Sequence, residues 1–417
     1  MSAEAFDLLL LECQLPDGTL ADVGCRGSHI AEIGRLAGRA AARTVPGRGH
    51  VLTPGLVEAH IHLDKGLLSE RAPSVEGTLA EALRVTGEAK RRFTAEDIRA
   101  RARAVLDMAV RAGTTAMRGH VEVDPLVGLM GLDALLPLKA EYRAALDLQL
   151  CAFAQEGILQ APGTETLLAE ALRRGADLVG GCPYNDTDAR AQIDIVFRLA
   201  QQFDVDADFH VDFFDEPEHL HVKEVAEQAR QRGWQGRVAV GHLTELAALA
   251  PDEQDQVIQA LREAGVGVIV LPATDLYLMG RRDVRNVRRG LAPVKRLLAA
   301  GVPVAASTNN VRNAFTPVGN ASLPLMGYLL AVAAHMGTAR DLRDAFRMLT
   351  DHPARILRLS DYGLAVGCQA DLVLWEAERL EEILTALASP RLVVKRGRVS
   401  IEQERATREP WREARPA

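Results

Sequence analysis

The sequence lacks a disulfide framework, a long apolar run and a secretory signal. Its five cysteines are odd in number and stand far apart without a CxxC pair. We therefore expect buried thiols in a reducing compartment. No stretch approaches ~20 uninterrupted apolar residues, and residues 1–20 lack the basic region with which a secretory signal begins. Both absences predict a soluble, cytoplasmic protein without a membrane partner.

Long basic runs are also absent. The formal net charge is −7, the sequence pI is near 5.9, and lysine and arginine are scattered along the chain. This distribution argues against nucleic acid as a partner. The densest basic segment, RRDVRNVRR at residues 281–289, fits either a solvated face or the mouth of a site for an anionic substrate.

Apolar residues, in contrast, are plentiful enough for a large core. The chain has 417 residues, of which 48% are apolar and 25% are charged, which is ordinary for a globular protein. This length predicts one large domain with a smaller appendage, or two domains.

Short apolar runs alternate with segments of helical period from about residue 51 to residue 310. The alternation is typical of parallel strands joined by crossover helices. Eight strand candidates favour a closed α/β barrel, a (β/α)8 barrel of the TIM type, over a doubly wound sheet. The candidates are GLVEAHIHLD, TTAMRGHVEV, LDLQLCAFAQ, ADLVGGCP, ADFHVD, RVAVGHLT, VGVIVLP and PVAASTNN.

Helical patterns such as TETLLAEALRRG lie between these strands, and several end in glycine, as helix C-caps do. Two more amphipathic patterns follow the last strand, at residues 322–337 and 339–357.

The two ends of the chain have a different pattern, with short alternating segments between turns. Neither end is long enough for a stable sheet by itself. We therefore expect both to combine in one β domain, residues 1–50 plus 365–417, beside a barrel of residues 51–364.

A pair of histidines gives the strongest local signal. His60 and His62 lie two apart in GLVEAHIHLDK, and residues two apart on a strand point to the same side, so both can bind one metal ion. Two ordinary polar residues at a strand end explain the pair equally well.

Further polar residues share this placement at the ends of successive strand candidates, where a parallel barrel has its active site. A shared site explains this placement of five of the 11 histidines better than chance does. The additional residues are His120, Gln155, His210 and His242.

Several segments resemble, in order, those of cytosine deaminase and related members of the amidohydrolase superfamily. They are HIHLDK, RGHVEVD, FAQEGIL, FHVD, GHLTE and DYGLAVGCQADLVL, and they cover nearly the whole chain. The resemblance implies a (β/α)8 barrel with a composite β domain. It also implies one divalent metal ion, zinc or iron, that activates water for attack at a carbon–nitrogen centre.

The resemblance assigns roles to individual residues as well. It implies that His60, His62 and His210 bind the metal. It places His242 near the attacked carbon and gives Gln155 the role of an amide that contacts the substrate. Neutral imidazoles suit a borderline divalent ion, and a carboxamide both donates to and accepts from a ring amide.

Two catalytic positions depart from the family pattern. The family has HxDE after the fifth strand, with a glutamate that carries protons, where this chain has His210-Val211-Asp212-Phe213. The family has an aspartate at the end of the eighth strand, where this chain has Asn309. We keep Asn309 as an expected metal ligand, but it has no charge and cannot accept a proton in the useful range. Metal affinity and water activation should both weaken.

Three interpretations of these departures compete. In the favoured one, the protein still hydrolyses a carbon–nitrogen bond of a small cyclic amide or aminated heterocycle. In the second, it is a relative that binds a small ligand or a metal without hydrolysis. In the third, it is a lyase or isomerase whose metal polarises a carbonyl. In the first case another group takes over proton transfer, and the candidates are His242, Asp212, Asp215 and Glu216.

The sequence says least about the residues that contact the substrate. We expect His120, Gln155 and Phe213 to line it, since an aromatic ring can pack against a flat ligand. Asp64 and Lys65 either touch the substrate or form an ion pair that braces the loop. Barrels of this type often associate, so the chain is a candidate for a homo-oligomer.

Overall fold

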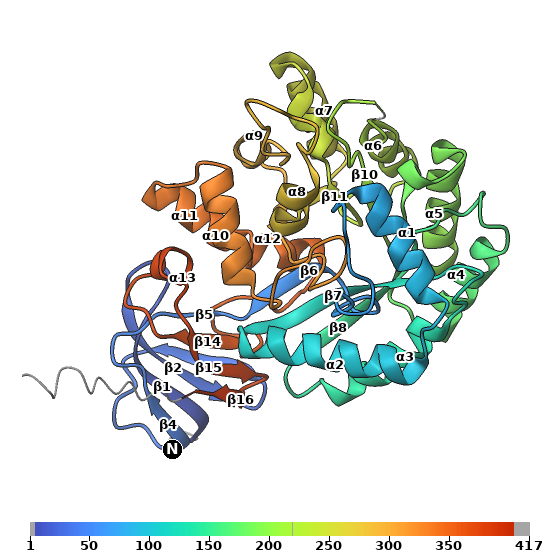
Figure 1. Cartoon of the computed structure of the whole chain (residues 1–417). Coiled ribbons are helices and arrows are strands. Elements are labelled where there is room, and N and C mark those ends of the chain that lie inside the picture. Colours follow the sequence, from blue (N-terminus) through green and yellow to red (C-terminus); the bar gives the residue numbers. More distant parts are fainter. Residues whose placement is uncertain (1–4, 219, 404–417) are drawn as a thin grey trace, which may run out of the picture.

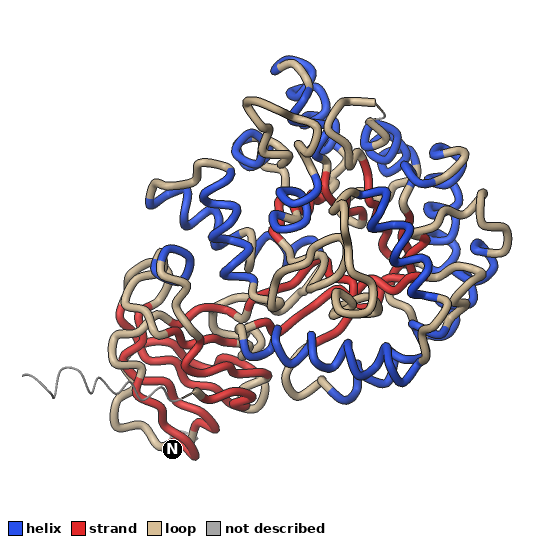
Figure 2. The backbone as a smooth tube through the Cα atoms, viewed as in Figure 1, coloured by secondary structure: helices blue, strands red, loops and turns tan. Residues whose placement is uncertain are grey.

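The computed structural model describes residues 5–218 and 220–403. Within them, eight parallel strands form one sheet in which each strand lies beside its neighbour in the sequence (Figure 1, Figure 2). The predicted α/β barrel is confirmed, and each strand candidate overlaps one of the eight strands. They are β6 (Leu56–His62), β7 (Thr114–Glu122), β8 (Asp147–Ala154), β9 (Leu178–Gly181), β10 (Asp206–Val211), β11 (Val238–His242), β12 (Gly267–Val270) and β13 (Val304–Ala306).

The first and last strands of the barrel meet at Asn309. Its N–H donates to the carbonyl oxygen of His60 at 2.9 Å, and its own carbonyl oxygen accepts from the N–H of His62 at 2.8 Å. The residue just beyond β13 is therefore held between the two histidines of β6.

Helices surround the barrel, and its strands are buried on both faces. Every residue of β6 and β7 is buried, as expected for parallel strands covered by helices. The predicted glycine C-cap is seen at Gly175, which ends α4 with φ +109°. The surrounding helices are α2 (Ala95–Arg111), α3 (Met130–Glu141), α4 (Thr164–Arg174), α5 (Ala189–Phe203), α6 (Val222–Gln231), α7 (Pro251–Glu263), α8 (Pro272–Leu278) and α9 (Val294–Ala299), with 3-10 turns η1 (Pro183–Asn185) and η2 (Thr244–Ala248).

The connection from β6 to β7 contains one more helix, α1 (Leu79–Lys90), which crosses the carboxyl-end face of the barrel (Figure 1). Thr78 caps its start, because Oγ1 accepts from the N–H of Glu81 at 3.1 Å. Ala82 packs with Phe213 and Phe315 in one buried apolar cluster. The helix therefore covers the end of the barrel at which the predicted site lies.

Both ends of the chain form sheets beside the barrel (Figure 1). One sheet has the order β3-β2-β1-β4 and the other β16-β15-β14-β5. A single buried cluster contains Leu8 and Val23 of the first sheet and Leu372 and Val394 of the second. The expected composite β structure from both termini is confirmed for the described residues. Its strands are β1 (Phe6–Gln14), β2 (Leu20–Arg26), β3 (His29–Gly34), β4 (Ala41–Pro46), β5 (Leu52–Pro54), β14 (Leu372–Trp375), β15 (Pro390–Lys395) and β16 (Arg398–Glu402).

The domain boundaries at residues 50 and 365 stay a prediction, and residues 404–417 lie outside the described residues. Strand β5, which the predicted boundary assigns to the barrel, pairs with β14 of the terminal sheet.

Further helices follow the barrel, as the sequence predicts. The pattern at residues 339–357 forms two helices. Pro353 lies in the first turn of the second one, α12 (Asp351–Ile356). A proline is tolerated there because the N–H groups of the first turn have no intrahelical partner, whereas it would break the middle of a longer helix. Across residues 5–218 and 220–403, no helix combines the length and the apolar character that a membrane span requires. These helices are α10 (Leu323–Ala333), α11 (Ala339–Arg347), α12 (Asp351–Ile356) and, before β15, α13 (Glu382–Thr385).

Candidate active site

Four buried histidine rings gather inside the carboxyl end of the barrel. His60 and His62 come from β6, His120 from β7 and His210 from β10, and each is at most 2% exposed. The His60 ring centroid lies 3.9 Å from that of His120 and 4.5 Å from that of His210. The His62 centroid lies 5.4 Å and 5.3 Å from the same two rings. Three strands far apart in the sequence thus contribute to one cluster.

The register of the strands explains why the rings meet. His62 pairs with His120 on the neighbouring strand, and His60 and His62 point to one side because side chains alternate along a strand. His210 pairs with Gly241 of β11. A methyl group at Gly241 would touch the His60 ring at 3.4 Å, in ordinary van der Waals contact.

The cluster suits a metal ion. One ring nitrogen of each of His60, His120 and His210 lies within 4.8 Å of those of the other two. Both ring nitrogens of His60, Nδ1 of His62 and Nε2 of His210 are buried and find no hydrogen-bond partner among the described residues. Buried polar atoms without partners are costly. A metal ion bound to one nitrogen of each ring would remove that cost at the bound nitrogens.

The imidazoles are also in the form that binds metal. Burial lowers the pKa of His60, His62 and His210 well below the ordinary value for histidine, and nearby positive charge lowers it further. Neutral imidazole is the metal-binding form.

A carboxylate stands behind the cluster. Oδ1 of Asp208 lies 3.3 Å from Nε2 of His120, in ion-pair range but outside hydrogen-bond geometry, and Oδ2 accepts from Nη1 of Arg118 at 3.1 Å. A carboxylate in this position typically orients a metal-binding histidine.

Asn309 lies next to the cluster, because its backbone is bonded to those of His60 and His62. Its Oδ1 is buried and has no hydrogen-bond partner within the described part of the chain. Its backbone is left-handed, with φ +60°, as it is at Asp212 (φ +52°) and His242 (φ +73°). This conformation costs roughly 1–3 kcal/mol per residue outside glycine, and such residues concentrate at functional sites. The strained positions here all follow or end barrel strands.

His242 forms a pair with Asp275, a residue that no motif in the sequence identifies. The His242 Nδ1 lies 2.7 Å from Oδ1 of Asp275, and both side chains are buried. Asp275 lies in α8, in the segment LPATDLYL directly after the seventh barrel strand. Its position just beyond a strand end was a usable signal, because the expected site residues have the same placement.

Phe213 packs against His242 and against the covering helix. Its ring centroid lies 3.8 Å from that of His242, with 29° between the planes. It shares an apolar cluster with Ala82 of α1, Met279 and Phe315. In this structure, the expected stacking face of Phe213 is thus occupied by an imidazole.

Gln155 directly follows β8 and contacts two residues of a buried polar network, Lys65 and Cys182. Its Oε1 lies 3.4 Å from Nζ of Lys65 and its Nε2 lies 3.6 Å from Sγ of Cys182. Burial raises the pKa of the Cys182 thiol to about 12, so the thiol stays protonated. All five cysteines are free.

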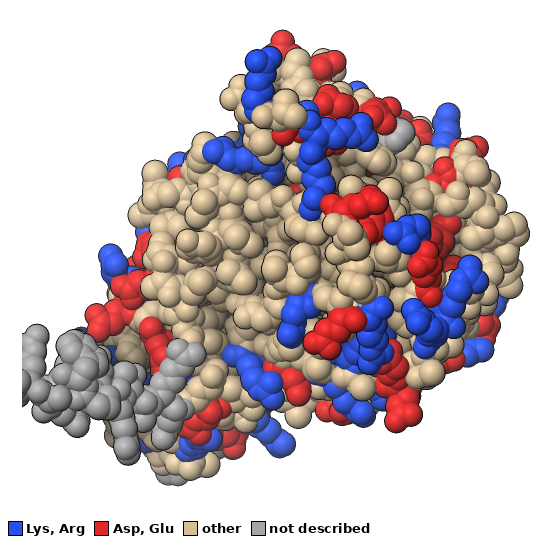
Figure 3. All heavy atoms as spheres, in the orientation of Figure 1, with Lys and Arg blue, Asp and Glu red and all other residues tan. Residues whose placement is uncertain are grey.

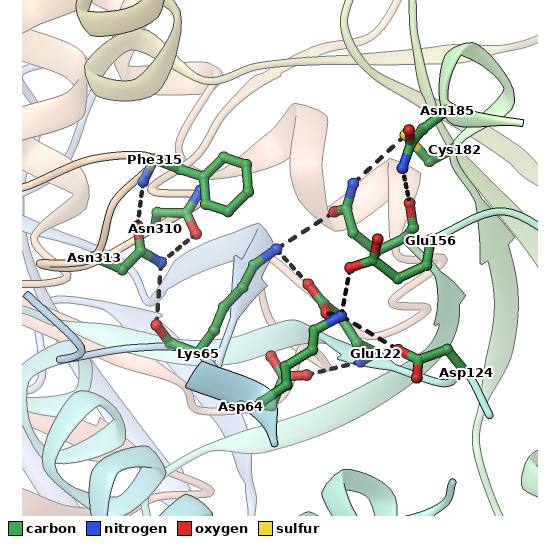
Figure 4. A network of polar contacts seen from close by, with 12 residues as sticks. Asp64, Lys65, Glu122, Asp124, Glu156, Cys182, Asn185, Asn310, Asn313 and Phe315 are labelled. Atoms are coloured by element: carbon green, nitrogen blue, oxygen red, sulfur yellow. Dashed lines mark hydrogen bonds and ion pairs between the residues drawn. The ribbon is translucent and has the colours of Figure 1, made fainter. Parts of the chain in front are cut away.

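Lys65 and Lys90 share the carboxylate of Glu122. Nζ of Lys65 donates to Oε1 of Glu122 at 2.5 Å, and Nζ of Lys90 contacts the other oxygen. Lys90, at the end of α1, also pairs with Asp124 at 3.2 Å and with Glu156 at 2.7 Å. Lys65, which faces Phe315 at 4.5 Å (Figure 4), therefore both forms an ion pair and borders the site.

The acidic residues considered as proton carriers make other contacts. Oδ1 and Oδ2 of Asp212 accept the N–H groups of His221 and Val222, at the start of α6, at 2.7 Å and 3.1 Å. Asp215 accepts the N–H of Gly280 at 2.8 Å. Their roles in proton transfer stay predictions.

Glu216 and part of the basic segment 281–289 bind each other. Arg288 pairs with Glu216 at 2.8 Å and with Asp283 at 2.8 Å. Basic and acidic side chains are interspersed over the face in Figure 3. This pairing favours the solvated-face interpretation of the segment.

Comparison with known proteins decides the family. The model of the amidohydrolase family matches residues 44–401. The chain belongs to this family.

Individual members of the family are similar over nearly the full length of the chain. The chain is 27% identical to N-isopropylammelide isopropyl amidohydrolase of Pseudomonas sp. (strain ADP), covering 96% of this chain and 98% of that protein. It is 29% identical to pterin deaminase of Rhizobium rhizogenes, covering 94% and 88%. The structure of 5-methylcytosine deaminase from Klebsiella pneumoniae, liganded with 5-fluorocytosine, has a TM-score of 0.92 and 30% identity, covering 97% of this chain and 100% of that chain.

As a member of the amidohydrolase family, the protein is a hydrolase that acts on carbon–nitrogen bonds, as the sequence predicted. The family is metal-dependent, and the buried histidine group can hold a metal ion. The site differs from the family pattern where Phe213 and Asn309 stand, and Asp275 provides a buried carboxylate at a third position.

Proposed function

We propose that the protein uses one divalent metal ion, zinc or iron, to hydrolyse a carbon–nitrogen bond of a small nitrogen heterocycle or cyclic amide. One observation carries this proposal. The carboxyl end of the barrel holds a buried cluster of neutral imidazoles whose ring nitrogens lack partners among the described residues.

The proposed metal donors are histidines and one amide. His60, His62 and His210 keep their expected role, with Oδ1 of Asn309 as a neutral oxygen donor. His120 joins them in this proposal, because its donor atom lies within 4.8 Å of those of His60 and His210. A divalent ion bound there would supply Lewis acidity, which makes water a better nucleophile near neutral pH.

The proposed substrate class comes from the relatives and from the residues around the cluster. N-isopropylammelide, pterin and 5-methylcytosine, for which the similar proteins are named, are nitrogen heterocycles. Gln155 offers an amide and Phe315 an apolar ring for a flat polar ligand, while Phe213 stacks on His242. We expect no turnover of cytosine itself, because Phe213 replaces the glutamate that serves it in the family.

Metal analysis together with a substrate screen tests the proposal. Protein dialysed against metal-free buffer should retain about one zinc or iron per chain, as expected for a buried histidine site. It should also hydrolyse one or more cyclic amides or aminated heterocycles. The double variant His60→Ala, His62→Ala should lose both metal and turnover.

A matched variant controls for the loss of a histidine as such. His29 is exposed on β3, outside the cluster, and His29→Ala should keep the metal and the activity. Turnover that survives complete metal loss would contradict the proposed chemistry.

A second candidate function rests on Phe213 and Asn309, which replace two groups that move protons in the family. A non-hydrolytic relative that binds a small ligand would need neither group. A folded, metal-free protein that takes up no metal when it is offered would favour this alternative.

We also propose a cytoplasmic location. Association into a homo-oligomer stays a prediction, and analytical ultracentrifugation of the purified protein tests it.

A further inference from the structure

His242 and Asp275 form a buried pair at the edge of the histidine cluster. Nδ1 of His242 lies 2.7 Å from Oδ1 of Asp275, whose Oδ2 accepts the N–H of Leu271 at 3.0 Å. Asp275 is 0% exposed and His242 is 2% exposed. With both carboxylate oxygens acting as acceptors, the ring proton of His242 belongs on Nδ1, and the lone pair lies on Nε2.

The rest of the ring is fixed by packing. Phe213 stacks on it at 3.8 Å, and the ring of His210 stands edge-on at 5.3 Å with 85° between the planes. The bond at Nδ1 and the stack on one face set the direction of the imidazole. Nε2 is then the atom left to meet a molecule bound beside the cluster.

Other buried carboxylates near the strand ends are engaged differently. Asp212 accepts two N–H groups at the start of α6, and Asp208 pairs with Arg118 and lies beside His120, a proposed metal donor. Asp275, in contrast, binds a histidine that is not among the proposed donors. Asp275 would therefore act through the ring of His242 and not by direct contact with the substrate.

We propose that Asp275 is the positioning residue that holds His242 as the proton acceptor of the reaction, in place of the carboxylate that is missing at Asn309. This inference rests on the proposed hydrolysis and names the group that performs its proton transfer.

In the proposed step, water adds to the carbon of the carbon–nitrogen bond. As the new carbon–oxygen bond forms, the π electron pair of that carbon's double bond moves onto the attached nitrogen or oxygen, and Nε2 of His242 takes one proton of the water. The carbon–nitrogen bond then breaks with its electron pair leaving on nitrogen, and His242 returns the proton to that nitrogen. The displaced π pair re-forms the double bond as the nitrogen leaves. An aminated heterocycle thus gives an amine and a hydroxy heterocycle, the tautomer of an oxo compound, whereas a cyclic amide opens to one molecule with an acid and an amine. His242 regains its starting form.

The first test is the position of the proton on His242 in the wild-type protein. Nitrogen-15 NMR of protein labelled at histidine distinguishes the two neutral tautomers, and the signals of His242 are assigned by their loss in His242→Gln. We expect the proton on Nδ1. A proton on Nε2 in the wild-type protein would overturn the inference, whether or not a substrate has been found.

The second test is Asp275→Asn. Its amide can donate to Nδ1, which moves the ring proton to Nε2 and removes the acceptor. We expect kcat to fall on the order of 10²–10⁴-fold, with KM changed little and the metal content of the holoenzyme unchanged. Wild-type kcat in a folded Asp275→Asn enzyme would overturn the inference and leave the proposed function standing.

Asp212→Asn is the matched comparison, because Asp212 is also a buried aspartate that accepts backbone N–H groups at a helix start. If this variant lost turnover and Asp275→Asn kept it, proton acceptance would belong to Asp212. If the wild-type enzyme loaded with zinc or iron hydrolysed no heterocycle at all, the proposed function would fail, while the tautomer would still report on the pair.

Discussion

At the scale of single residues, Asn309 offers a sharp test of the metal site. Its Oδ1 is buried without a partner among the described residues, and its backbone is bonded to those of His60 and His62. Asn309→Asp places a charge there, and a contact with a charged group contributes about 1.5–3 kcal/mol. We expect metal affinity to rise about tenfold or more, measured by competition with a chelator. The metal-free variant should melt at a lower temperature than the wild type, because its new buried charge is unpaired.

The neighbouring asparagine supplies the control for that change. Oδ1 of Asn310 already accepts from Nδ2 of Asn313 at 2.7 Å, so Asn310→Asp should leave metal affinity nearly unchanged. Equal effects of the two substitutions would show that Asn309 does not face the ion.

The residues of the site differ in how far the sequence could predict them. His60 and His62 share one strand, so their spacing alone predicts that they act together. His210 and His242 follow from their placement at strand ends. The placement of Asp275 after the seventh strand makes it a candidate, but its contact with His242 could not be predicted, because the two residues lie 33 positions apart and meet only in the folded barrel. For Asp212 the sequence did suggest a catalytic role. Its contacts with the start of α6, however, could not be predicted, because they depend on the fold.

At the scale of elements, the barrel strands were predictable and the covering helix was not. A parallel strand is buried on both faces and therefore forms an apolar run in the sequence, so all eight strands could be recognised there. Helix α1 owes its position to tertiary contacts, namely Ala82 in the cluster of Phe213 and Lys90 among three carboxylates. Neither contact can be seen in a window of the sequence.

The turn that precedes α1 depends on Glu81. Its carboxylate accepts the hydroxyl of Ser74 at 2.5 Å and the N–H groups of Val75, Glu76 and Gly77 at 2.7–2.8 Å. Glu81→Gln removes the charge that these donors share, so hydrogen exchange of the three amides should become several-fold faster. Exchange measured by mass spectrometry tests this, and Glu88→Gln, on the exposed side of the same helix, should leave those amides unchanged.

The same contacts set a pH dependence for the covering segment. The hydrogen bond from Ser74, followed by those from the backbone N–H groups, lowers the pKa of Glu81 to about 2. A group whose pKa is lowered by folding stabilises the fold above its ordinary pKa, and this contribution is lost as the pH falls toward the folded value. Protection of the amides of Val75, Glu76 and Gly77, corrected for intrinsic exchange rates, should therefore persist at mildly acidic pH and fade near pH 2. Loss of protection already near neutral pH would contradict the role of Glu81.

At the scale of the whole molecule, the two ends of the chain could be assigned to one β structure, because neither end is long enough to form a stable sheet alone. The way this structure attaches to the barrel could not be predicted, since it depends on pairs far apart in the sequence. Lys395 of β15 is 1% exposed, and its Nζ donates to the carbonyl oxygen of Thr115 on β7 at 3.0 Å. It also pairs with Asp147 of β8 at 2.6 Å and with Asp371 at 2.5 Å. One buried cation thus joins the terminal sheet to two barrel strands.

Lys395→Met should therefore destabilise the whole molecule and not only the sheet that contains it. Removing one partner of a buried ion pair leaves the other charge uncompensated, which costs about 3–5 kcal/mol. Lys139→Met is the matched control, because Lys139 pairs with Asp177 at 2.7 Å with both side chains about one-third exposed, and such pairs contribute about 0–1 kcal/mol. Urea unfolding followed by circular dichroism measures both free energies. If Lys395→Met lost no more stability than Lys139→Met, the attachment of the sheet to the barrel would have to rest on the apolar contacts around Trp375 and Val373, which pack within the barrel core.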